Sequence, residues 1–129
     1  MVVRPALLRL FSVTLMLHLL LVIVQAGFAG SFLSGSDIAV AFHSINSLII
    51  GLVCLIQLAI TIRMRVLRAC PTWVLLAAIV LVLAEAVQIY AGVTRLLSVH
   101  VPLAVAIAAV IAGLIGWTLS RGRAMETAQ

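Results

Sequence analysis

Four long apolar runs dominate the sequence and restrict its possible folds more than any other feature. A helix needs about 20 predominantly apolar residues to cross the hydrocarbon core of a bilayer. Of the 129 residues, 66% are hydrophobic and 9% charged, whereas soluble domains have about 25% charged residues. The sequence therefore predicts one all-α integral membrane domain over residues 1–129, an up-and-down four-helix bundle followed by a polar tail at 120–129. The runs cover roughly residues 8–28, 38–62, 72–93 and 98–119.

The arginines predict the orientation of these helices. The N-terminal segment has two arginines, the connection at 63–71 has three and the C-terminal segment has two. The connection at 30–37 has none, and the connection at 94–98 has only Arg95. Because basic residues concentrate on the cytoplasmic side of membranes, we expect both termini in the cytoplasm. The first run could also be a cleaved signal peptide, but its apolar core is long for one.

Composition narrows the setting and excludes some functions. The chain is rich in alanine, valine and leucine and has arginine but no lysine, which is typical of GC-rich bacterial genomes. We therefore expect a multi-pass protein of the bacterial cytoplasmic (inner) membrane. The net charge of +5 does not indicate nucleic-acid binding, because no aromatic or glycine pattern accompanies the arginines. Cys54 and Cys70 do not define a disulfide framework, and both are expected to act as small apolar residues.

Residues that favour helix starts agree with the four runs. Ser36 or Asp37 can cap the second helix, and Ser98 the fourth, because their side chains accept hydrogen bonds from free backbone N–H groups. Thr72 can serve the third helix. Pro102 would then lie in the first turn of the fourth helix, where a missing N–H costs little.

Polar side chains inside the apolar runs are the candidates for function, because burying them in lipid is costly. His18 and Glu85 both fall near the middle of the membrane, where pairing would relieve the desolvation of each. Such a pair could be a structural clasp or part of a proton path. The full set is His18, Gln25, His43, Asn46, Gln57, Glu85, Gln88 and His100.

His43 and His100 form a second expected pair. In the predicted orientation both helices that carry them begin at the outer side of the membrane. Counted from those helix starts, the depths of the two histidines differ by roughly 6 Å. Two imidazoles at similar depth on different helices suit axial ligation of a haem iron. We expect haem b near the outer leaflet, with the two ligating nitrogens about 4 Å apart across the iron. In the alternative, the histidines bond backbone carbonyls or each other and bind no metal.

Small residues follow both histidines at helical spacing. They would leave room for a flat macrocycle, although ordinary packing of membrane helices uses the same residues. Arg95 could pair with the haem propionates, because guanidinium groups bind carboxylates through two hydrogen bonds. It could equally be an interfacial arginine without a ligand. The small residues are Ser47, Gly51 and Cys54 after His43, and Ala104 and Ala108 after His100.

A weak internal repeat and a family resemblance support the pairing. "QAGFAGSFLS" precedes His43 much as "QIYAGVTRLLS" precedes His100. The segments "FHSINSLIIGLV" and "HVPLAVAI" resemble the second and fourth helices of the haem A synthase family. Each four-helix half of that family carries histidines on those two helices. The resemblance therefore implies one such half, with His43 and His100 as the axial ligands of a b-type haem.

The chain departs from the family at positions tied to its oxidative chemistry. The family has an acidic residue about one turn before the second-helix histidine, where this chain has Ala39 and Val40. It has an arginine directly after that histidine, where this chain has Ser44. The outer-loop cysteine pair is also missing. These departures argue against an enzyme and favour a small b-type cytochrome.

The sequence thus predicts electron transfer or haem handling, with a redox partner or a larger membrane complex, and allows a homodimer. One alternative is a proton-coupled transporter that uses Glu85, dimerised like the small multidrug-resistance exporters. That family carries its essential glutamate on the first helix, where this chain has no acid. The other alternative is an accessory membrane subunit whose polar residues only specify packing.

Overall fold

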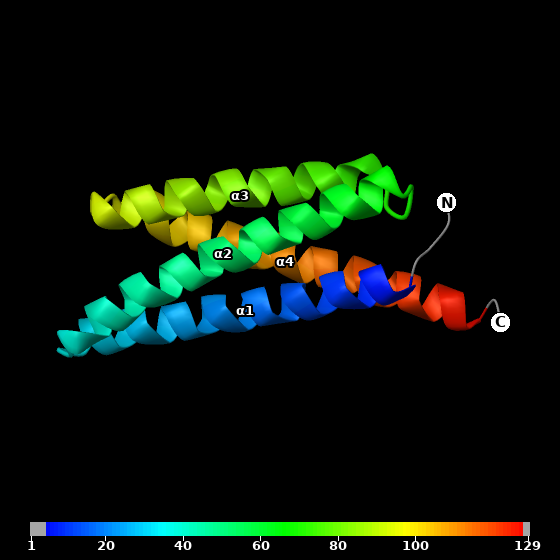
Figure 1. The fold of residues 1–129 in the computed structure, drawn as a ribbon. Helices are drawn as coiled ribbons and strands as arrows, with labels where there is room; N and C mark the ends of the chain where they lie inside the picture. Colours follow the sequence, from blue (N-terminus) through cyan, green and yellow to red (C-terminus); the bar gives the residue numbers. More distant parts are fainter. Residues whose placement is uncertain (1–4, 128–129) are drawn as a thin grey trace.

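The computed structural model describes residues 5–127, which form four α-helices joined by three short loops (Figure 1). All four helices are long and apolar enough to cross a membrane, which confirms the predicted all-α class and the number of candidate spans. Arg4, one of the arginines used for orientation, lies outside the described residues. The helices are α1 (Pro5–Leu33), α2 (Ile38–Val66), α3 (Thr72–Val93) and α4 (Leu97–Glu126).

Three helices extend beyond the apolar runs that predicted them. α1 runs to Leu33 rather than 28, and α2 runs to Val66 rather than 62. α4 begins at Leu97 and ends at Glu126, so the predicted polar tail at 120–129 is helical through most of its length. An apolar run indicates only the part of a helix that fits the hydrocarbon core of a bilayer. The backbone hydrogen bonding of the helix continues into flanking polar residues that have adequate helix propensity. The 30 residues of α4 span about 45 Å, longer than a hydrocarbon core of about 30 Å.

Of the predicted helix caps only Asp37 lies at the N-cap position, and no side-chain capping hydrogen bond forms at the start of α2, α3 or α4. Asp37 directly precedes α2 but makes no side-chain capping hydrogen bond, and Pro71 rather than Thr72 precedes α3. Leu96 precedes α4, which places Ser98 inside the helix and Pro102 in its second turn rather than its first. Backbone contacts take over this task. The N–H of Val99, for example, which a side-chain cap would otherwise bind, donates to the Leu96 carbonyl at 3.0 Å.

All three loops begin with the same backbone motif. One residue at the end of each helix adopts a positive φ: Gly35 (98°), Arg68 (53°) and Arg95 (58°). The following residue donates its N–H five residues back, as from Leu96 to the Ala91 carbonyl at 2.8 Å. This is the Schellman arrangement, which satisfies carbonyls at a helix end. Arg95 therefore has a role in ending α3, independent of any ligand.

The four helices form a ring in which each contacts two neighbours. α1 packs on α2 and α4, and α3 packs on the same two helices, so α1/α3 and α2/α4 are the diagonal pairs. The first turns of α1, the last turns of α4 and the loop at 67–71 share one end of the bundle, hereafter the terminal end. The loops at 34–37 and 94–96 lie at the opposite end, where the hairpins α1–α2 and α3–α4 diverge (Figure 1). We call this the open end.

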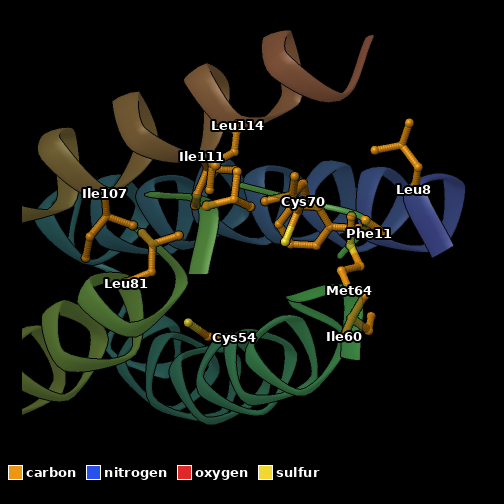
Figure 2. Close-up of a cluster of buried hydrophobic side chains, with 13 residues drawn as sticks. Leu8, Phe11, Cys54, Ile60, Met64, Cys70, Leu81, Ile107, Ile111 and Leu114 are labelled. Carbon is orange, nitrogen blue, oxygen red and sulfur yellow. The ribbon is translucent and has the colours of Figure 1, made fainter. Parts of the chain in front are cut away.

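The apolar core occupies the half of the bundle toward the terminal end. Figure 2 shows its side chains pointing inward from the helices, with Cys54 and Cys70 among them. Both cysteines are buried and unpaired, consistent with the apolar role expected of them. The tightly packed half holds the helices together, so the open end is free to carry polar residues. The cluster contains Leu8, Phe11, Leu15, Cys54, Ile60, Met64, Ala69, Cys70, Val74, Leu81, Ile107, Ile111 and Leu114.

Candidate functional site

His43 and His100 lie next to each other at the open end, on the diagonal helices α2 and α4. Their ring centres are 6.1 Å apart and their planes are inclined by 50°. Two imidazoles bound to one iron from opposite sides would have ring centres about 6 Å apart, since each metal–nitrogen bond is about 2 Å and each nitrogen lies about 1 Å from its ring centre. Because α4 starts at Leu97, the depths of the two histidines differ by only about 3 Å along the helices. The spacing therefore fits ligation of one metal ion by both rings.

Hydrogen bonds fix the tautomer of both rings. His43 Nδ1 lies 3.2 Å from the Gln25 carbonyl oxygen, and His100 Nδ1 lies 3.0 Å from that of Gln88. A carbonyl oxygen only accepts hydrogen bonds, so each Nδ1 carries the hydrogen. In the neutral rings Nε2 then holds the lone pair, and neither Nε2 has a hydrogen-bond partner within residues 5–127. Histidines that bind metals almost always donate their other nitrogen in this way.

The two hairpins hold their histidines by the same contact. In each hairpin the imidazole of the second helix donates to the backbone carbonyl of a glutamine in the first helix. This geometry agrees with the internal repeat in the sequence, where Gln25 precedes His43 and Gln88 precedes His100. Backbone bonding of the histidines was the alternative to metal binding. It is present, but it uses only one nitrogen of each ring.

The surroundings of the two glutamines differ. The Gln25 amide donates to the His43 carbonyl at 3.0 Å, and its oxygen accepts from the Asn46 amide at 2.7 Å. Gln88 Oε1 is buried and has no partner in the part of the chain that the structure describes. A buried acceptor without a partner costs about 1–3 kcal/mol. This oxygen, on the helix that anchors His100, is available to a donor from a bound group.

Gly92 allows the close approach of His100 to α3. A Cβ atom at this position would lie 3.0 Å from His100 Cε1 and 3.3 Å from Nδ1, which is closer than ordinary contact. Gly51 differs, because a Cβ there would meet only Ile89 Cδ1 at 3.9 Å. Gly51 therefore lies against α3 without restricting a histidine ring. Gly92 is the small residue that lets the His100 ring approach α3.

The other expected pair, His18 and Glu85, also forms and crosses the second diagonal from α1 to α3. His18 Nε2 lies 3.1 Å from Glu85 Oε1, and His18 Nδ1 lies 2.9 Å from Gln57 Oε1. The Gln57 amide donates to the Thr14 carbonyl at 2.8 Å. His18 is 0% exposed, Gln57 2% and Glu85 6%, so the contacts lie inside the bundle. We refer to His18, Gln57 and Glu85 as the His18 cluster.

The protons of the His18 cluster can be counted from its contacts. The Gln57 amide nitrogen donates to a carbonyl, so its oxygen accepts and His18 Nδ1 carries a hydrogen. The contact between His18 Nε2 and Glu85 then needs one more proton, held either by the ring or by the carboxyl group. The pair is therefore either an ion pair or two neutral partners, and its net charge is zero in both cases. A buried pair of this kind avoids the cost of an isolated charge.

The remaining predicted residues lie around the histidine pair in different ways. Ala104 is partly buried one turn after His100, where the sequence placed it. Arg95 is exposed in the 94–96 loop and forms no ion pair within the described residues. The roles predicted for these residues and Gly51 toward a haem remain predictions.

Sequence reasoning missed the residues that support the two pairs. Gln57 was one of the polar residues in the apolar runs and had no predicted partner, yet it contacts the second nitrogen of His18. Gly92 was not among the candidate residues, yet it makes room for His100. A signal existed for Gly92, because a glycine one turn after Gln88 within a helix calls for a packing explanation. No comparable signal pairs Gln57 with His18, because their contact joins separate helices.

Comparison with known proteins finds no matching family model, curated protein or solved structure. The similarity to one half of a haem A synthase therefore remains a prediction based on its short motifs. Within the described residues, no group of three or more His, Cys, Asp or Glu side chains could hold a metal ion alone. A metal ion at the histidine pair would therefore need further ligands from outside these side chains, such as water or a cofactor.

Proposed function

We propose that this protein binds one b-type haem between His43 and His100 and serves in electron transfer or haem handling. The observation that carries the proposal is the pair of rings with centres 6.1 Å apart, each with Nδ1 committed to a carbonyl and Nε2 without a partner in the described chain. The arginine distribution supports insertion into a bacterial cytoplasmic membrane with both termini in the cytoplasm.

The residues present fit such a group. His43 and His100 would hold the iron, while the carbonyls of Gln25 and Gln88 keep each Nε2 free of its hydrogen. Haem would supply one-electron chemistry through its ferric and ferrous states. Because both histidines would bind the iron, neither oxygen nor a substrate would find an open position on it. The proposal is accordingly a cytochrome-like carrier or haem-handling protein rather than an oxygen-using enzyme.

The purified protein supplied with haem tests this proposal. We expect one haem per chain and a six-coordinate, low-spin spectrum with a b-type α-band on reduction. A five-coordinate spectrum would contradict the pairing of both histidines. Colourless protein after removal of unbound haem would contradict haem binding itself. Proton-coupled flux that depends on Glu85 in colourless protein would favour the transporter alternative.

Gly92→Ala tests the fit of the His100 ring against α3. We expect haem affinity to fall roughly 10–100-fold, the usual cost of disturbing a group that orients a metal ligand. The added Cβ would lie 3.0 Å from the ring and move it away from the Gln88 carbonyl. Haem titration followed by absorbance measures the change.

Gly113→Ala is the matched control for this substitution. It adds the same methyl group to α4, the helix that carries His100, at a position where no atom would lie within 4 Å. Its haem affinity should equal that of the unsubstituted protein. Equal affinities for the two variants would show that the position of the His100 ring against Gly92 is unimportant for binding.

A further inference from the structure

A groove at the terminal end has features of a binding site that the proposed haem function does not use. It lies between the first turns of α1 and the last turns of α4 and has a volume of about 770 Å³. Arg9 lines it from α1, and Arg121 and Arg123 line it from α4. Apolar residues of the same two helices, Leu8 and Leu119 among them, complete the lining.

Contacts between α1 and α4 hold the groove in place. Ser12 Oγ and Thr118 Oγ1 lie 3.1 Å apart, which joins the two helices by a hydroxyl contact along the groove. Leu8 is buried and belongs to the apolar core. The walls of the groove are thus joined to each other and to the packed half of the bundle.

The charges of the groove are unbalanced. Glu126 is the one carboxylate among the residues that line it, against three arginines. The ion pairs of the described residues comprise only His18–Glu85, so none of these guanidinium groups has a carboxylate partner there. Three arginines that line one groove and have no carboxylate partner among the described residues favour an anion. Guanidinium groups bind phosphate through paired hydrogen bonds.

The groove also straddles the boundary between apolar and polar surface. On α1, the exposed apolar side chains begin at Leu10, one residue after Arg9. On α4, they end at Leu119, two residues before Arg121. If the bundle spans a bilayer, the arginines lie at the level of the lipid headgroups and the apolar wall lies beside the acyl chains. This inference rests on that part of the proposed function and is independent of haem.

We propose that the groove binds an anionic phospholipid. Arg9, Arg121 and Arg123 hold its phosphate, and the part of an acyl chain nearest the headgroup packs against Leu8 and Leu119. Basic pockets between membrane helices recognise lipid headgroups in this way. The headgroup should carry no amine, because an amine would cancel the phosphate charge and add a cation beside the arginines.

Native mass spectrometry of protein released from vesicles with equal phosphatidylglycerol and phosphatidylcholine tests this proposal. We expect the protein to retain phosphatidylglycerol preferentially. Arg121→Gln should lower that retention roughly fivefold, as expected for one arginine near an anionic headgroup. Arg121→Lys should keep most of it, since the charge remains. Arg63→Gln, which removes the same charge from α2 outside the groove, should leave retention unchanged.

Three results would overturn the proposal. Equal retention of both lipids would show that the groove does not select charge. An equal loss in Arg63→Gln would show that total charge, rather than the groove, attracts the lipid. Displacement of phosphatidylglycerol by inorganic phosphate at equal concentration would show an anion site without a lipid component. Because the readout is lipid mass, these results do not depend on whether the protein binds haem.

Discussion

Replacing His43 or His100 with alanine is expected to abolish the six-coordinate haem spectrum. Each substitution removes one of the two nitrogens that are free to bind iron, leaving at most a five-coordinate, high-spin centre. Haem affinity should fall more than about 100-fold, because changes to groups that only orient a ligand already cost roughly 10–100-fold. The double variant should bind no haem. Absorbance titration and electron paramagnetic resonance measure affinity and spin state.

Neighbouring substitutions and chemical rescue make this test specific. Ser44→Ala and Val99→Ala change exposed residues next to the two histidines and should leave the spectrum unchanged. In His43→Gly, added imidazole should restore the six-coordinate spectrum, since it can occupy the vacated space. A low-spin spectrum that persists in both single alanine variants would show that other residues bind the iron, and the proposed site would be wrong.

His18→Leu is expected to destabilise the bundle by about 2–6 kcal/mol, because it leaves two buried polar groups without partners, each at about 1–3 kcal/mol. Glu85 would lose its proton-sharing contact and Gln57 would lose its donor. This exceeds the roughly 0.6 kcal/mol average for hydrogen bonds between membrane helices, since the unpaired groups remain inside the bundle. Unfolding in detergent or in a bilayer, measured without haem, gives the free energy.

Two substitutions at Glu85 separate a structural clasp from a proton path. Glu85→Gln should cost less than about 1 kcal/mol, because the new amide can donate to His18 Nε2. Glu85→Leu should cost about 1–3 kcal/mol, because it leaves only His18 Nε2 without a partner. The glutamine variant keeps the contact but cannot exchange the proton. If it unfolds normally yet loses proton-coupled activity, the cluster carries protons. If it keeps all activity, the cluster is a clasp.

The contacts within the two polar pairs could be predicted from the sequence, whereas the residues that position each pair could not. An imidazole and a carboxyl group inside apolar runs at similar depth have few possible partners. The contact between His18 and Glu85 could therefore be predicted from the free-energy cost of burying each group alone. The proximity of His43 and His100 followed from helix direction and depth. Gln57, Asn46 and Gly92 act through contacts between particular helix faces. Depth does not predict which face of one helix meets another.

The helix ends likewise include features that the sequence predicts and features that it does not. Apolar length located the four candidate membrane spans, but three helices continue past their runs and the predicted side-chain caps do not form. Instead, backbone bonds after Gly35, Arg68 and Arg95 close the loops. A glycine at such a position is readable in a sequence. An arginine is not, because its positive φ is imposed by the path of the chain between two packed helices.

The sequence by itself determined that this chain forms four apolar helices and places polar residues at two depths inside them, because the bilayer requires length and penalises buried charge. Only the tertiary structure decided that the two polar pairs cross different diagonals, with His18 to Glu85 between α1 and α3 and His43 to His100 between α2 and α4. The physical reason is packing. The rotation of each helix about its axis depends on how its side chains fit those of its neighbours, and periodicity along one helix does not contain that information.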